Sequence, residues 1–254
     1  MTVLGEHRTG VVGAITSRIE VKLADVPDMD LVALRDNRGE ICVKGKRCTK
    51  GYYKDPHSTA EIFDADGWLH TGDIGEWTSE GALKVVDRVK SIFKLAQGEY
   101  VAPEKVEMVY QGCQLIDQIL VDAKPEHNFP VAVVTPNFTN LRSDFYRHLI
   151  SCKTKDGQLS ELKPSDISRL SDTDICKIKE VRRLVLQKMN EVAVENGLKG
   201  FEMVKSVYLN DNPFTIENGL LTPTMKLSRH KARRHLQPII EMLYSERDFV
   251  KINV

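Results

Sequence analysis

The residues best suited to chemistry lie in one segment, residues 66–90, with the sequence DGWLHTGDIGEWTSEGALKVVDRVK. It contains Thr71-Gly72-Asp73, which we expect to form a tight turn, and the pair Asp87-Arg88 at the end of the next apolar run. A carboxylate accepts hydrogen bonds from ribose hydroxyls, and a guanidinium donates to hydroxyls or phosphate oxygens. These residue types therefore favour a nucleotide site. The simpler alternatives are an aspartate that only closes its own turn and a charged pair that only solvates a strand end.

Two further stretches carry lysines beside turn residues. Lys94 precedes Gly98-Glu99-Tyr100, and Lys226 ends the string LLTPTMK of residues 220–226. A positioned ammonium group stabilises negative charge that a carboxylate and a phosphate share in a transition state. The alternative for each lysine is an exposed and chemically silent side chain, since lysines are mostly on the surface.

Residues 39–103 and 218–229 closely resemble the long-chain fatty acyl-CoA synthetases, a branch of the adenylate-forming enzymes. The resemblance implies that Asp73 and Arg88 are cofactor-binding residues that hold the ribose of the nucleotide. It also implies that Asp87 is the hinge between a large and a small domain. A hinge needs only a few residues that tolerate a change of backbone angles, and an element end is where such a change costs least.

The resemblance gives roles to the second group of residues as well. Lys226 is implied to be the catalytic lysine that reaches the substrate carboxylate and the α-phosphate. Lys94 matches a second catalytic lysine, which serves the second half-reaction, and Gly98 marks the cofactor-binding segment that swings toward the acyl-adenylate when CoA attacks. Met225 stands where many family members carry glycine but agrees with the long-chain branch. The string TPTMK disfavours a short-chain synthetase or a luciferase-like oxygenase.

The implied activity is the ligation of a long-chain fatty acid to CoA. ATP and Mg²⁺ would convert the fatty acid to acyl-AMP with release of pyrophosphate, and CoA would then take the acyl group. The chain corresponds to the C-terminal portion of a synthetase, and its sequence shows neither a Ser/Thr/Gly-rich phosphate loop nor the motif whose glutamate helps hold magnesium. A cleft needs both sides to orient reactants and exclude water, so we expect the chain alone to be inactive. The alternative is a non-catalytic truncated isoform or interaction module that binds nucleotide weakly or associates with a full-length synthetase.

Composition limits the partners. Of 254 residues, 36 are Lys or Arg and 36 are Asp or Glu, so no net field draws the chain to nucleic acid. The basic residues 226–234 would suit phosphate, CoA or peripheral association with an anionic membrane, and a solvated helix face is the alternative.

Five scattered cysteines without a CxxC indicate a reducing, intracellular compartment. The resemblance implies the cytosolic face of the endoplasmic reticulum or another organelle. The cysteines and seven histidines show no metal-ligand spacing, so we expect no metal site.

The apolar periodicity predicts an α+β fold in two parts that meet at Asp87. Residues 1–86 are typical of strands and turns, and the resemblance makes them the C-terminal β-rich part of the large AMP-binding domain. Residues 87–254 alternate strands and helices, and would be the small, mobile C-terminal domain. The expected helices include one opened by Asp55-Pro56 with a Ser58–Glu61 capping box, one unbroken helix over 174–196 and a last helix over 228–244 that follows the Lys226 loop.

Overall fold

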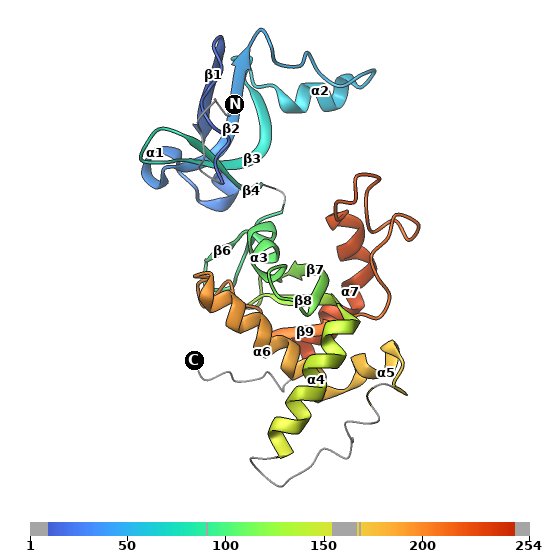
Figure 1. Cartoon of the computed structure of the whole chain (residues 1–254). Coiled ribbons are helices and arrows are strands. Elements are labelled where there is room, and N and C mark those ends of the chain that lie inside the picture. Colours follow the sequence, from blue (N-terminus) through green and yellow to red (C-terminus); the bar gives the residue numbers. More distant parts are fainter. Residues whose placement is uncertain (1–9, 90, 154–166, 168, 247–254) are drawn as a thin grey trace. The chain divides into compact units, whose positions relative to one another are not determined.

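The computed structural model describes residues 10–89, 91–153, 167 and 169–246. It divides into two compact units, Met1–Ile92 and Phe93–Val254 (Figure 1). Both units contain strands and helices, and the predicted α+β fold is confirmed. The division falls shortly after Asp87. The assignment of residues 1–86 and 87–254 to the large and small domains of a synthetase stays a prediction.

The first unit is built on a four-stranded antiparallel sheet. Its elements are β1 (Ile19–Ala24), a 3-10 turn (Pro27–Met29), α1 (Ala33–Asp36), β2 (Arg38–Gly45), α2 (Pro56–Ile62), β3 (Leu69–Trp77) and β4 (Leu83–Arg88). The strands lie side by side in chain order, β1-β2-β3-β4. β-Branched and aromatic residues favour these strands because they pack well on a pleated surface. Ile41 of β2 and Ile74 of β3 are buried in the core.

Residues 69–77 form one strand, so the prediction of a tight turn at Thr71-Gly72-Asp73 was wrong. These three residues form a bulge in β3 opposite the single residue Ile41 of β2. Gly72 has a φ of 73°, a left-handed conformation that glycine adopts without steric cost. The local signal of a turn was therefore real, but the strand resumes beyond it. A bulge of this kind redirects side chains without ending the ladder.

Helix α2 begins as predicted but with a different cap. The side chain of Asp55 accepts a hydrogen bond from the Ser58 backbone N–H at 3.0 Å, and Pro56 occupies the first turn, where its missing N–H costs nothing. Ser58 thus lies inside the helix. The Ser58–Glu61 capping box was wrong because the aspartate before the proline takes the capping position.

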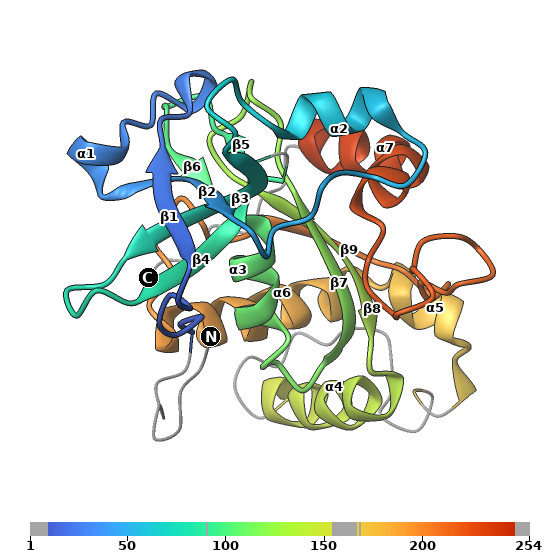
Figure 2. The same ribbon diagram turned by 90° about the horizontal axis from the view of Figure 1, so that it is seen from above.

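The second unit places helices on both faces of a three-stranded sheet. Its elements are β5 (Phe93–Lys94), β6 (Tyr100–Val101), α3 (Pro103–Tyr110), β7 (Ile116–Asp122), β8 (Val131–Pro136), α4 (Phe138–Lys153), α5 (Asp172–Lys177), α6 (Lys179–Glu195), β9 (Ser206–Leu209) and α7 (Arg229–Ser245). β8 pairs antiparallel with β7 and parallel with β9. Side chains alternate along β8. Ala132 and Val134 pack with residues of α3, α4 and α6, whereas Val131 and Val133 pack with residues of α7. Figure 2 shows the strands of this sheet, β7, β8 and β9, in a second view.

The apolar period over residues 174–196 predicts one helix, and this was wrong. The chain forms α5 and α6, separated by Ile178, whose backbone is extended (φ −76°, ψ 120°). Ile175 before the break and Val181 after it are both fully buried in the same core. The helical spacing of apolar residues continues across the break because both helices bury their apolar residues in one core.

Candidate functional site

Asp73 and Arg88 are cross-strand neighbours on β3 and β4. The Arg88 Nε lies 3.4 Å from the Asp73 Oδ1, and the arginine and aspartate side chains are 71% and 32% exposed. An exposed ion pair of this kind contributes little to stability, so either group can turn toward a ligand at small cost. The structure thus brings together the two residues that the sequence assigned to the ribose. Their binding of a ribose stays a prediction.

Asp87 precedes Arg88 but is only 3% exposed. It lies opposite Ile74, next to an irregularity in the β3–β4 register. Its Oδ1 accepts a hydrogen bond from the Arg88 backbone N–H at 2.6 Å. Asp87 is therefore a fixed, buried carboxylate near the end of the last strand of the first unit. Its function as a hinge stays a prediction.

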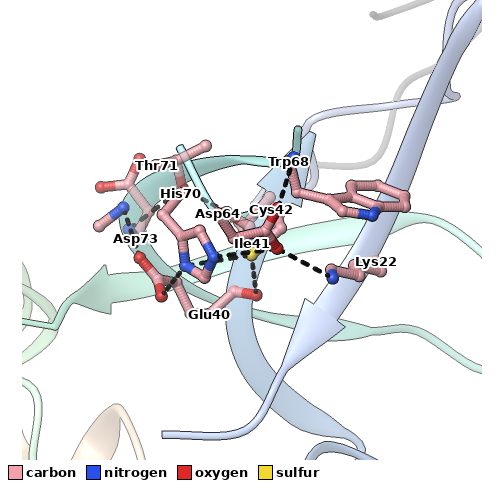
Figure 3. Close-up of polar contacts among 10 residues, drawn as sticks. Lys22, Glu40, Ile41, Cys42, Asp64, Trp68, His70, Thr71 and Asp73 are labelled. Atoms are coloured by element: carbon pink, nitrogen blue, oxygen red, sulfur yellow. Dashed lines mark hydrogen bonds and ion pairs between the residues drawn. The ribbon is translucent and has the colours of Figure 1, made fainter. Parts of the chain in front are cut away.

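The bulge that carries Asp73 is held by Glu40 of β2, a residue that sequence reasoning did not single out (Figure 3). The Glu40 Oε1 accepts a hydrogen bond from the Gly72 N–H at 3.0 Å, and its Oε2 lies 2.7 Å from the Nδ1 of His70. The Thr71 hydroxyl donates to a backbone carbonyl of β2 at 2.8 Å. Glu40 is therefore a positioning residue for the bulge, because its one carboxylate joins the bulge and the preceding histidine to β2.

The same side of the sheet gathers several titratable groups (Figure 3). Glu40, Cys42 and His70 each offer one donor atom, and these atoms lie within 4.8 Å of one another. Burial, reinforced by the Glu40 carboxylate, raises the pKa of the Cys42 thiol to about 11. The pKa of the neighbouring Asp64 is lowered, and the main cause is the hydrogen bond that its carboxylate accepts from the Trp68 backbone N–H. Rules based on close spacing in sequence did not find this group, because its members come from two strands.

In the second unit, Lys94 and Gly98 share the hairpin formed by β5 and β6. Lys94 pairs with Tyr100 across the two strands, and its Nζ lies 5.2 Å from the centre of the tyrosine ring. The Leu95 N–H donates to the Glu99 carbonyl at 2.8 Å, and Gly98 turns the chain with a φ of 89°. A cation over an aromatic face is only weakly held when it is exposed. Lys94 is exposed, so its ammonium group is accessible to solvent.

Lys226 lies on the loop before α7, as predicted, and is exposed. The loop is a tight hairpin: the Thr222 N–H donates to the Lys226 carbonyl at 2.8 Å, and the Met225 N–H donates to the Thr222 carbonyl at 2.8 Å. Met225 has a φ of 61°. This left-handed conformation suits the glycine that many family members carry at this place, and a methionine adopts it at a cost of about 1–2 kcal/mol.

The helix behind this loop is anchored by two arginines. Arg229 lies 2.6 Å from the buried Glu107 of α3, and Arg233 lies 2.9 Å from the buried Asp122 of β7. Burial raises the pKa of Glu107 to about 7, against the opposing charge of Arg229. Burial likewise raises the pKa of Asp122 against the opposing charge of Arg233. The start of α7, and with it the attachment of the Lys226 hairpin, is therefore tied to α3 and β7.

Comparison with solved structures defines the class of protein. The adenylation domain of a carboxylate reductase from Mycobacterium chelonae superposes with a TM-score of 0.71 and 32% identity, over 90% of this chain and 31% of that one. A carboxylic acid reductase A domain from Segniliparus rugosus, solved with AMP and a co-purified carboxylic acid, gives a TM-score of 0.70 and 30% identity, over 89% of this chain and 32% of that one. The chain has the fold of the corresponding part of an adenylation domain. No protein-family model matches it.

Curated relatives narrow the class to one family. Long-chain-fatty-acid–CoA ligase 5 of Mus musculus is 44% identical over 94% of this chain, and ligase 1 of Homo sapiens is 41% identical over 96% of it. A peroxisomal long chain acyl-CoA synthetase 7 of Arabidopsis thaliana is 42% identical over 95%. The resemblance is thereby confirmed, and the chain is a homologue of the long-chain-fatty-acid–CoA ligases. It spans about a third (32%) of the length of these relatives. None of the helices in its described residues is long and apolar enough to cross a bilayer.

Proposed function

We propose that this chain provides the C-terminal third of the catalytic machinery of a long-chain fatty acyl-CoA synthetase. The observation that carries the proposal is the pairing of Asp73 with Arg88 across β3 and β4, with Asp73 displayed by the bulge that Glu40 holds. The two side chains offer an acceptor and a donor, the combination that a ribose requires. Homology to ligases of long-chain fatty acids supports the substrate class.

In the proposed reaction, a fatty-acid carboxylate attacks the α-phosphate of ATP, and pyrophosphate leaves. The CoA thiol then attacks the acyl carbonyl, and AMP leaves. Lys226 would stabilise the charge shared by the carboxylate and the α-phosphate in the first step. Its exposed position on a short, closed hairpin is suited to that role, since the hairpin limits where the ammonium group can reach. Mg²⁺ would assist the first step, and its carboxylate ligand would lie in the part of the synthetase that precedes these residues.

We further propose that Asp87 is the hinge about which the second unit rotates between the two steps. Rotation would withdraw Lys226 and bring in the Gly98 hairpin with Lys94 for the attack by CoA. Two properties support this proposal: the two units are separately compact, and Asp87 lies near the end of β4, shortly before their division. A hinge consists of a few loop or element-terminal residues that absorb the change in backbone angles.

These residues alone would not complete the reaction, because they show neither the phosphate loop nor the magnesium-binding motif of the synthetases, and a cleft needs both sides to orient reactants. The alternative function is a non-catalytic truncated isoform or interaction module that binds nucleotide weakly or associates with a full-length synthetase. Association with a membrane would be peripheral and would use the exposed basic residues of the segment 226–234, such as Lys231 and Arg234, because Arg229 and Arg233 are paired with buried carboxylates. Location at the endoplasmic reticulum or another organelle remains part of the proposal, and one relative is described as peroxisomal.

The ribose assignment is tested by titrating AMP into the chain and following binding by calorimetry. Arg88→Ala and Asp73→Asn should each weaken binding about 10- to 100-fold, since a hydrogen bond to a charged group contributes about 1.5–3 kcal/mol. Arg47→Ala is the matched control, because Arg47 is an exposed arginine in the same unit. Equal affinity in all three variants, or no binding of AMP by the unaltered chain at concentrations of about 10 mM, would contradict the assignment.

A further inference from the structure

One side of the first unit brings together a thiol, an imidazole and a carboxylate. Glu40 and Cys42 are two positions apart on β2, so their side chains point to the same face of the sheet. His70 of β3 pairs directly with Cys42. The His70 Nδ1 lies 2.7 Å from the Glu40 Oε2 and 3.5 Å from the Cys42 Sγ (Figure 3). The register of the two strands, rather than a local motif, thus brings the three donor atoms together.

We propose that Glu40, Cys42 and His70 form a binding site for a divalent transition metal of the zinc type. Zn²⁺ binds nitrogen, oxygen and sulfur at about 2.0–2.3 Å, which separates tetrahedral donors by roughly 3.3–3.8 Å. The distance from sulfur to nitrogen already falls in this range. The His70 Nδ1 and the Glu40 Oε2, now 2.7 Å apart, would need to separate by roughly 0.6 Å or more to admit the ion. A mixed thiolate, imidazole and carboxylate set suits Zn²⁺ or Co²⁺ and does not suit Mg²⁺ or Ca²⁺, which prefer oxygen ligands.

The neighbours of the three ligands are those that a metal site requires. Metal-binding histidines usually direct their second ring nitrogen toward a carboxylate, and here the Asp64 Oδ2 lies 3.6 Å from the His70 Nε2. Asp64 is itself held by the backbone N–H groups of Asp66 at 3.0 Å and Trp68 at 2.8 Å. The second oxygen of Glu40 is occupied by the Gly72 N–H. Glu40 is therefore held by a hydrogen bond, and the outer nitrogen of His70 faces a carboxylate that is itself held in place.

Binding of a divalent ion by these three residues conserves protons and leaves no excess charge. In the metal-free chain the His70 Nδ1–H donates to Glu40. When the ion binds, the imidazole proton resides on Nε2, facing Asp64, and the Cys42 thiol releases its proton to solvent. One carboxylate and one thiolate then neutralise the double charge of the ion. His70 is 31% exposed and Glu40 is 17% exposed, so water can occupy the fourth position, as it does in open zinc sites.

The test is a Co²⁺ titration of the full chain, because a cobalt–thiolate bond produces a charge-transfer absorption that is independent of any enzyme activity. We expect one Co²⁺ per chain, release of about one proton per ion, and loss of the band when Zn²⁺ is added. Cys42→Ser should abolish the band. Serine in place of each of Cys48, Cys113, Cys152 and Cys176 in turn should leave it intact.

Two further variants keep the test decisive if Cys42→Ser fails to fold. Asp64→Asn should weaken Co²⁺ binding about 10- to 100-fold while preserving the band, as expected for a residue that acts through His70. His70→Asn should weaken binding more strongly, with its folding checked by circular dichroism. The proposal is overturned if the unaltered chain gives no thiolate band, if the band survives in Cys42→Ser, or if His70→Asn binds Co²⁺ as tightly as the unaltered chain.

Discussion

Removal of the Glu40 carboxylate should destabilise the first unit selectively. Glu40→Ala deletes the acceptor of the Gly72 N–H and the partner of His70. A hydrogen bond to a charged group contributes about 1.5–3 kcal/mol, and leaving its partner unsatisfied adds to the loss. The His70 side chain is about a third exposed, so water screens that contact and reduces its contribution to about 1 kcal/mol or less. Together these contributions predict a loss of about 2–4 kcal/mol. Glu40→Gln keeps an oxygen for Gly72 and should lose only about 1 kcal/mol.

The assay is urea unfolding followed by tryptophan fluorescence in the presence of a chelator. The chain has two tryptophans, Trp68 and Trp77, and both lie in the first unit, so the signal reports on that unit. With a slope of about 1 kcal/mol per M for a small domain, Glu40→Ala should lower the midpoint by about 2 M or more. Glu61→Ala is the control, because its pair with His57 is exposed and its loss should cost less than about 0.5 kcal/mol. The reasoning is refuted if Glu40→Ala unfolds at the same urea concentration as this control.

Two further predictions concern the second unit, and both are measured by unfolding followed with far-ultraviolet circular dichroism. Tyr110→Phe should lower the free energy of unfolding by about 1–3 kcal/mol. The buried Tyr110 hydroxyl accepts a hydrogen bond from the Val204 N–H at 2.9 Å, and phenylalanine leaves that donor unsatisfied. An unchanged free energy of unfolding would show that the amide finds another partner. Met225→Gly should raise stability by up to about 1 kcal/mol, since it relieves the left-handed strain at φ 61°, and the β-branched Met225→Val should lower stability. A valine variant as stable as the glycine variant would show that the hairpin is not strained there.

Local signals predicted those elements whose causes are local. Ala102-Pro103 marks the start of α3, because proline suits a first turn, and the Thr-Pro turn ahead of a basic amphipathic segment places Lys226 before α7. The pairing of Asp73 with Arg88 could also be expected, since both belong to one short stretch of neighbouring strands. These features depend on residues that are close together in the chain.

The remaining features depend on contacts that a single sequence does not display. Gly72 gives the same signal in a turn and in a bulge, and the bulge is decided by pairing with β2 and by the carboxylate of Glu40. The break at Ile178 is hidden because α5 and α6 bury their apolar residues in one core. The group formed by Glu40, Cys42 and His70 was missed because Cys42 and His70 meet only through strand register. The sequence did contain one signal: Glu40 and Cys42 are two positions apart in a predicted strand, so their side chains are expected on the same face of the sheet.

The central claim is that Lys226 serves the adenylation step, and it is tested most directly in a chimera. This chain would replace the corresponding third of the mouse long-chain-fatty-acid–CoA ligase 5, its 44% identical relative. Palmitoyl-CoA formation would be measured from palmitate, ATP and CoA, and separately from synthetic palmitoyl-adenylate and CoA. Lys226→Ala should slow the first reaction about 100- to 1000-fold, as expected when one preorganised charge contact is lost, and should leave the second reaction nearly unchanged. If Lys226→Ala slows both reactions equally, the assigned role of Lys226 and the proposed rotation about Asp87 are both contradicted.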